Sequence, residues 1–124
     1  MHTRVLMILS AALMAIIGLA FSFVPQEVLS MHGTEPDTAT VMLLQMGGAV
    51  YLGFAILNWT ARGILIGGIY ARPVAMANFL HFVMVAIMLV KAAFTFGAPP
   101  LIGSATVFSA FAIWFGLVLF KPPV

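Results

Sequence analysis

Two asparagines, one tyrosine and one histidine interrupt long apolar runs in this sequence. They are Tyr51, Asn58, Asn78 and His81. Because hydrocarbon offers no hydrogen-bond partners, polar side chains in such runs need partners of their own and often mark a functional site. A neutral histidine there could be an axial ligand of a haem, or of the magnesium in a chlorophyll-type pigment. Together with Tyr51, His81 could instead bind a quinone or a lipid headgroup.

The spacing of these four residues predicts that they lie together. Asn58 shares a helix face with Tyr51, and Asn78 shares one with His81. Tyr51 and His81 each lie roughly nine residues from the inner end of their helices, which is about 13 Å deep. We therefore predict a polar seam between the second and third spans. The seam either joins the helices, through hydrogen bonds of about 0.6 kcal/mol each, or binds a ligand.

The composition indicates what surrounds these residues. Of the 124 residues, 64% are hydrophobic and 6% are charged, whereas a soluble domain has about 25% charged residues. A soluble domain of this size could not bury so much apolar surface. We predict an integral membrane protein with the lipid bilayer around it and no nucleic-acid partner. The sequence has no cysteine, which excludes disulfides and thiolate metal sites.

Four segments are long and apolar enough to cross a bilayer core of about 30 Å. The predicted spans are residues 5–24, 38–60, 73–96 and 101–120. The first run exceeds the apolar region of a signal peptide, so we expect it to remain as a span. Short connections make consecutive helices antiparallel neighbours. This predicts an all-α, up-down four-helix membrane bundle that forms a single transmembrane domain, residues 1–124.

The charged residues predict the orientation of this bundle. With four spans, four of the five basic residues share one side: Arg4, Arg62, Arg72 and Lys121. The acidic residues share the other side, in the first loop: Glu27, Glu35 and Asp37. The positive-inside rule then predicts cytoplasmic N and C termini. Lys91, near the outer end of the third span, can extend its long side chain to the headgroups.

Two connections carry local signals. In the first loop, Pro25 and Glu27 indicate the start of a short interfacial helix, residues 26–32, and Gly33 indicates its end. Residues 34–37 then cap the second span. Residues 64–70 could form an interfacial loop, a half-inserted segment or part of the third helix, although Gly67-Gly68 and Pro73 favour a break before that helix.

The second span also carries a longer pattern. Residues 45–62 read QMGGAVYLGFAILNWTAR, which resembles the pattern Q-x-x-G-A-x-x-L-G-x-A-x-x-N-W-x-A-R of small bacterial four-span membrane proteins of unknown function. Residues 23–29, FVPQEVL, look like the loop after the first helix in such proteins. The resemblance implies a bacterial inner-membrane topology and no particular activity. Within the pattern, Ala49 and Gly53 form a small-residue pair of the type that allows close helix packing.

Three functions fit these features. The first is a non-catalytic accessory or structural subunit, which docks on other membrane subunits or on itself. The second is a small-ligand binder for quinone, haem, pigment or lipid, centred on His81 and Tyr51 with Asn78 and Asn58 beside them. The third is an oligomeric small transporter or channel. We expect no enzyme, because all three acidic residues lie in one loop and leave little for acid–base catalysis.

Overall fold

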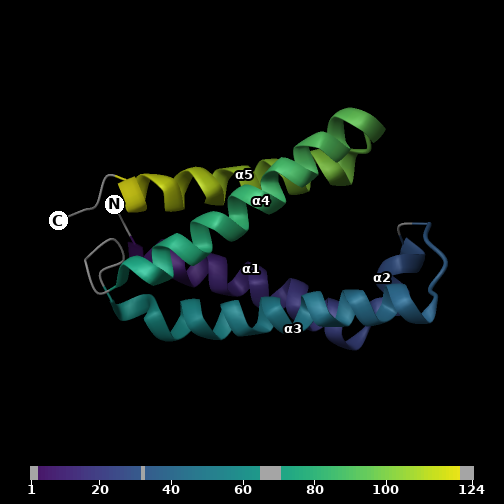
Figure 1. Ribbon diagram of the computed structural model, residues 1–124, viewed down its shortest axis with the longest axis horizontal. Coiled ribbons are helices and arrows are strands. Elements are labelled where there is room, and N and C mark those ends of the chain that lie inside the picture. The colour runs from purple at the N-terminus through teal and green to yellow at the C-terminus, as the bar shows by residue number, and fades with distance from the viewer. Residues whose placement is uncertain (1–2, 32, 65–70, 121–124) are drawn as a thin grey trace. The chain divides into compact units, whose positions relative to one another are not determined.

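The computed structural model describes residues 3–31, 33–64 and 71–120 of the chain. Within these ranges there are five α-helices, one 3₁₀ helix and no strand. In chain order they are α1 (Thr3–Phe23), α2 (Pro25–Met31), α3 (Thr38–Thr60), η1 (Ala61–Gly63), α4 (Arg72–Phe96) and α5 (Pro99–Phe120) (Figure 1). Four of these helices, α1, α3, α4 and α5, are long and apolar enough to cross a membrane. The chain is thus an all-α, multi-pass membrane protein.

The long helices begin and end within two residues of the predicted spans. The largest differences are at two starts: α1 begins at Thr3, and α5 begins at Pro99. Proline suits the first turn of a helix, because the N–H that it lacks would have no partner there. The carbonyl oxygen of Ala98 accepts bonds from the backbone N–H groups of Leu101 and Ile102, at 3.0 and 3.1 Å. The first turn of α5 therefore forms around the two prolines.

The short helix in the first loop is confirmed as α2. Its end is set by Gly33, which has a left-handed backbone with φ of 74°, a conformation that glycine adopts without a steric penalty. The N–H of Gly33 donates to the carbonyl of Ser30, and that of Thr34 donates to the carbonyl of Leu29. Residue 32, where the predicted helix ended, lies outside the described residues.

The helices form two compact units. Residues 7–63 make one of them, with most of α1 together with α2, α3 and η1, and the other contains α4 and α5. Of the connection predicted between the second and third spans, residues 65–70 lie outside the described residues. The α4 helix begins at Arg72 with Ala71 as its N-cap, so the break predicted before the third helix is confirmed; an interfacial loop and a half-inserted segment both remain open. The up-down order of all four spans and the cytoplasmic position of the termini stay predictions.

In the first unit, the backbones of α1 and α3 touch. A Cβ atom at position 48 would lie 2.9 Å from the backbone nitrogen of Ser22 and 3.0 Å from the carbonyl oxygen of Gly18. A Cβ atom at position 18 would lie 2.9 Å from the backbone nitrogen of Leu52. Glycine at both positions is therefore what allows the two helices to approach so closely, as small residues do in membrane helix pairs.

In the second unit, one phenylalanine of α4 inserts between rings of α5. Phe82 is fully buried. Its ring stacks on those of Phe111 and Phe115, with centroids 5.1 and 5.5 Å away, and lies 5.5 Å from that of Phe108. The three α5 rings are three and four residues apart, so they project from one side of that helix. Phe82 thus fixes the register of α4 against α5.

The ends of this helix pair are closed in different ways. At one end, Gly97 has a left-handed backbone with φ of 66° and donates its N–H to the carbonyl of Ala93 at 2.8 Å. This cap turns the chain tightly, so α4 and α5 pack side by side (Figure 1). At the other end, the ring of Phe79 meets that of Phe120 edge to face at 5.4 Å. A Cβ at Gly116 would lie 3.0 Å from the Phe79 ring.

The two adjacent glycines of α3 offer a matched test of the close approach. We expect Gly48→Ala to be about 1–3 kcal/mol less stable than Gly47→Ala, because the new methyl overpacks the α1 contact. A Cβ at position 47 meets nothing within 4 Å, and both substitutions gain the same helix propensity. Unfolding of the two variants in mixed micelles with increasing SDS measures the difference. Equal midpoints for the two variants would contradict the contact.

The N-cap of α3 predicts a pH dependence. The Asp37 carboxylate accepts a hydrogen bond from the backbone N–H of Thr40 at 2.7 Å, and this bond lowers the pKa of Asp37 below its ordinary value of 3.8. Because the pKa is lowered, the charged cap stabilises α3 fully at pH values above 3.8. This stabilisation is lost as the pH falls through the lowered pKa. We expect the NMR shift of the Thr40 amide to titrate with a midpoint below 3.8. Asp37→Asn should abolish that titration; a midpoint at or above the ordinary value would refute the cap.

Candidate functional site

Asn58, one of the four predicted site residues, is fully buried in the first unit. Its Nδ2 donates to the Oγ of Ser10 on α1 at 2.9 Å and lies 3.8 Å from the Sδ of Met14. The Ser10 hydroxyl in turn donates to the carbonyl of Met7 at 3.2 Å. Asn58 therefore joins α3 to α1, a contact that the sequence analysis did not predict.

Tyr51 lies on the side of α3 that packs on α1. Its ring meets that of Phe21 edge to face, with centroids 6.2 Å apart. One turn earlier, Gly48 makes the close backbone contact with Ser22, and Gln45 donates from Nε2 to the carbonyl of Ser22 at 3.5 Å. Tyr51 and Asn58 thus belong to the same face of α3, as their spacing predicted.

Asn78 and His81 lie on α4, in the second unit. Asn78 is fully buried, and its Nδ2 donates to the carbonyl of Val74 one turn earlier at 2.9 Å. The ring of His81 lies 5.2 Å from that of Phe82 and 6.4 Å from that of Phe108. His81 therefore borders the phenylalanine cluster between α4 and α5.

The predicted seam would join two pairs of residues that belong to different units. The structure brings Tyr51 and Asn58 together on α3, and Asn78 and His81 together on α4. Whether the two pairs meet is a property of how the units assemble, so the seam stays a prediction. Ser10 was not among the predicted site residues. The signal was its position, because Ser10 and Ser22 are the only polar residues of residues 5–24, and both contact α3.

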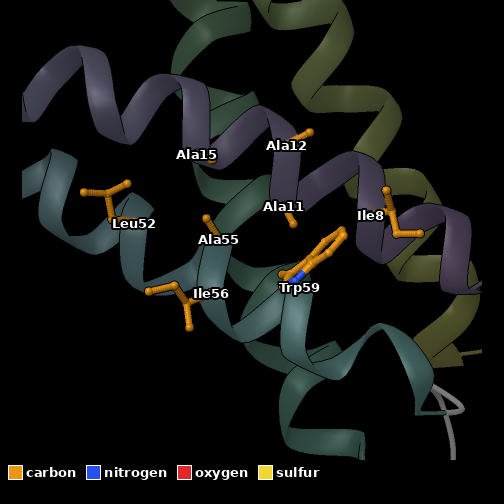
Figure 2. Close-up of a pocket in the computed structure, with 8 residues that line it drawn as sticks. All are labelled: Ile8, Ala11, Ala12, Ala15, Leu52, Ala55, Ile56 and Trp59. Carbon is orange, nitrogen blue, oxygen red and sulfur yellow. The ribbon is translucent and has the colours of Figure 1, made fainter.

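An apolar groove opens on one flank of the α1–α3 contact. Its volume is about 350 Å³. In Figure 2, Ala11 and Ala55 lie between the two helices, and the larger side chains of Leu52, Ile56 and Trp59 project from α3. The lining residues are Ile8, Ala11, Ala12, Ala15, Leu52, Ala55, Ile56 and Trp59. The Trp59 ring extends from α3 toward Ile8 of α1 (Figure 2), so one end of the groove is aromatic.

A basic side chain is held beside that aromatic end. The guanidinium of Arg62 lies over the Trp59 ring, with its central carbon 3.9 Å from the ring centroid. Its Nη1 also donates to the backbone carbonyl of Trp59 at 2.6 Å. The two contacts combine a cation–π interaction with a hydrogen bond. They fix a positive charge next to the groove, at the end of α3 opposite Asp37.

The described residues offer few ligands for a metal or cofactor. Across residues 3–31, 33–64 and 71–120, no three His, Cys, Asp or Glu side chains lie together. His81 alone supplies one imidazole, which is enough for one axial position of a haem or pigment and not for a bare metal ion.

Comparisons of this chain with protein families, with curated proteins and with solved structures find no match. The resemblance of residues 45–62 to small four-span membrane proteins stays a prediction.

A double-mutant cycle tests the bond between Asn58 and Ser10. We expect Asn58→Ala and Ser10→Ala to be coupled by about 0.6 kcal/mol and at most about 1.7 kcal/mol, the range for such bonds between membrane helices. Thr60 provides the matched control, because its hydroxyl donates to carbonyls of its own helix, those of Ile56 and Leu57. A cycle of Ser10→Ala with Thr60→Ala should show no coupling. If both cycles gave the same value, the interhelical bond would not contribute to stability.

Proposed function

We propose that this chain is a non-catalytic membrane subunit, which supports a larger membrane complex or a homo-oligomer, in the inner membrane of a bacterium. The observation that supports the proposal is the face of α3 turned away from α1. Of the four spanning helices, α3 buries the smallest share of its most apolar stretch, 11% against 22–33% in the others. We place the contact with a partner helix on this face.

The side chains on this face suit helix packing. Met46, Ala49 and Gly53 are all exposed, and a Cβ at position 53 would meet nothing within 4 Å. Gly48 and Gly53 thus have different roles, because Gly48 contacts α1 and Gly53 faces outward. An outward glycine with an alanine four residues earlier lets a second backbone approach closely, and Met46 can adapt to an irregular partner.

The polar groups support a structural role as well. Asn58 is bonded to Ser10 and Asn78 to the carbonyl of Val74, so both amides contribute hydrogen bonds to the helices themselves. The acidic residues lie outside the spans, in the segment of the chain that connects α1 to α3. They are Glu27, Glu35 and Asp37. A subunit that acts through packing has no need of acid–base groups within the membrane.

A second candidate is a small-ligand binder centred on His81 and Tyr51. It is favoured by the position of His81, whose half-buried imidazole borders the rings of Phe82 and Phe108. Flat aromatic neighbours suit a quinone, haem or chlorophyll-type ring. The absorption spectrum of the purified protein separates the candidates: a band above the aromatic region that disappears in His81→Ala supports a pigment or haem.

The subunit proposal predicts a site-specific loss of assembly. We expect the protein purified in mild detergent to have a native mass above that of one chain, either with copies of itself or with other membrane proteins. Gly53→Leu should return it to one chain, because the larger side chain blocks backbone approach. Gly103→Leu on α5 is the matched control, since position 103 is also an exposed helical glycine with nothing within 4 Å of a Cβ. A single chain in both detergent and bilayers would overturn the proposal.

A further inference from the structure

The α1–α3 groove and Arg62 together have the features of a lipid site. The groove is lined almost wholly by carbon, and Trp59 is the only lining residue with a polar atom in its side chain. From Leu52 to Trp59 it extends over seven residues of α3, or about 10 Å. That is about a third of the hydrocarbon thickness of one bilayer. The groove is therefore long enough for the upper part of one acyl chain, nearest the headgroup.

We propose that this groove binds one acyl chain of an anionic phospholipid, with the lipid phosphate at Arg62. The proposal is separate from the subunit function, because the groove lies where α1 meets α3 and Gly53 is not among its lining residues. The lipid would belong to the leaflet at the Arg62 end of the helices.

The shape of the groove favours a chain over a bulkier occupant. Ala11, Ala12, Ala15 and Ala55 leave a shallow channel where larger side chains would fill the space. An unfilled channel would lose dispersion contacts along its length. A single flexible hydrocarbon chain restores these contacts and needs no hydrogen-bond partner.

The charge favours an anionic headgroup. Arginine has five N–H donors in a planar fork that matches a phosphate, and the bond to the Trp59 carbonyl uses one nitrogen of that fork. The ring contact and the bond hold the guanidinium in place, so little side-chain entropy is lost when a phosphate binds. The acidic residue nearest to Arg62 in the sequence is Asp37. Asp37 precedes the first residue of α3 and Arg62 follows the last, so the two are about 35 Å apart along the helix.

Quenching of tryptophan fluorescence by brominated lipids tests this site. The chain has two tryptophans, so Trp114→Phe leaves Trp59 as the only reporter. This protein is placed in phosphatidylcholine vesicles that contain an equal, minor fraction of brominated phosphatidylglycerol or brominated phosphatidylcholine. We expect Trp59 to prefer the anionic lipid about fivefold, the magnitude for one basic side chain at a membrane surface.

Variants test whether the preference for anionic lipid arises at Arg62 and the groove. In the Trp114→Phe background, Arg62→Gln should bring the ratio of the two quenching constants close to one. Arg72→Gln, which removes an exposed basic charge at the start of α4, should leave the ratio unchanged. Ala12→Leu fills the groove from its exposed side, so it should reduce quenching by both lipids. For the two charge variants the ratio is compared, since Arg62→Gln also alters the environment of the Trp59 ring; for Ala12→Leu the quenching by each lipid is compared.

The remaining outcomes distinguish other occupants. Inorganic phosphate at constant ionic strength should leave the ratio unchanged; if it abolishes the preference, the site binds free phosphate and the lipid proposal is wrong. Absence of quenching by either lipid would mean that protein covers the groove, which also overturns the proposal. Trp59→Phe, with Trp114 as reporter, should show no preference. An equal preference there would indicate general enrichment of anionic lipid around the protein and would refute a local site.

Discussion

In hydrocarbon, a backbone N–H or C=O without a partner costs several kcal/mol, and the structure of this chain depends on that constraint. The four long helices satisfy most of their backbone groups internally, and two of their ends have specific caps. Asp37 accepts from the first turn of α3, and Gly97 closes the last turn of α4. Polar side chains follow the same rule. Asn58 within a span bonds to Ser10, and Asn78 bonds to a carbonyl of its own helix.

The same constraint explains which parts of the fold could be predicted from the sequence. The thickness of the bilayer determines how long an apolar segment must be, so the four spans were predicted to within two residues. Local capping chemistry is equally direct, because Gly33 and Asp37 act through backbone groups a few residues away. These predictions needed only the composition and the spacing of neighbouring residues.

Which side of each helix packs against its neighbour was harder to predict. Spans that are apolar on all sides carry almost no periodic signal for which face turns inward. Matching Tyr51 and His81 by depth identifies polar residues at the same level of the membrane. It takes no account of how closely two helices can approach. The α1–α3 pairing depends on shape, since Gly48 and Gly18 leave room for backbone contact, and that contact brings Ser10 within reach of Asn58. Ser10 could not be identified from its own segment, because its partner Asn58 is 48 positions away in the sequence.

The small residues of α3 show that the same residue type has different consequences on different faces. Gly48 is covered by α1, so its lack of a side chain brings two backbones together. Ala55 lies in a groove and Gly53 on an exposed face. At both positions, lipid or another protein must fill the space that a larger side chain would occupy.

Lipid is always present at high local concentration, so a protein partner must displace it from either surface. A fixed charge such as Arg62 adds to the affinity of one class of lipid and strengthens its hold on the groove. Met46, Ala49 and Gly53 are uncharged. Lipid therefore binds to their side of α3 without added electrostatic attraction and is displaced more easily. Charge thus favours lipid in the groove beside α1 and leaves the side of α3 that carries Gly53 to another helix.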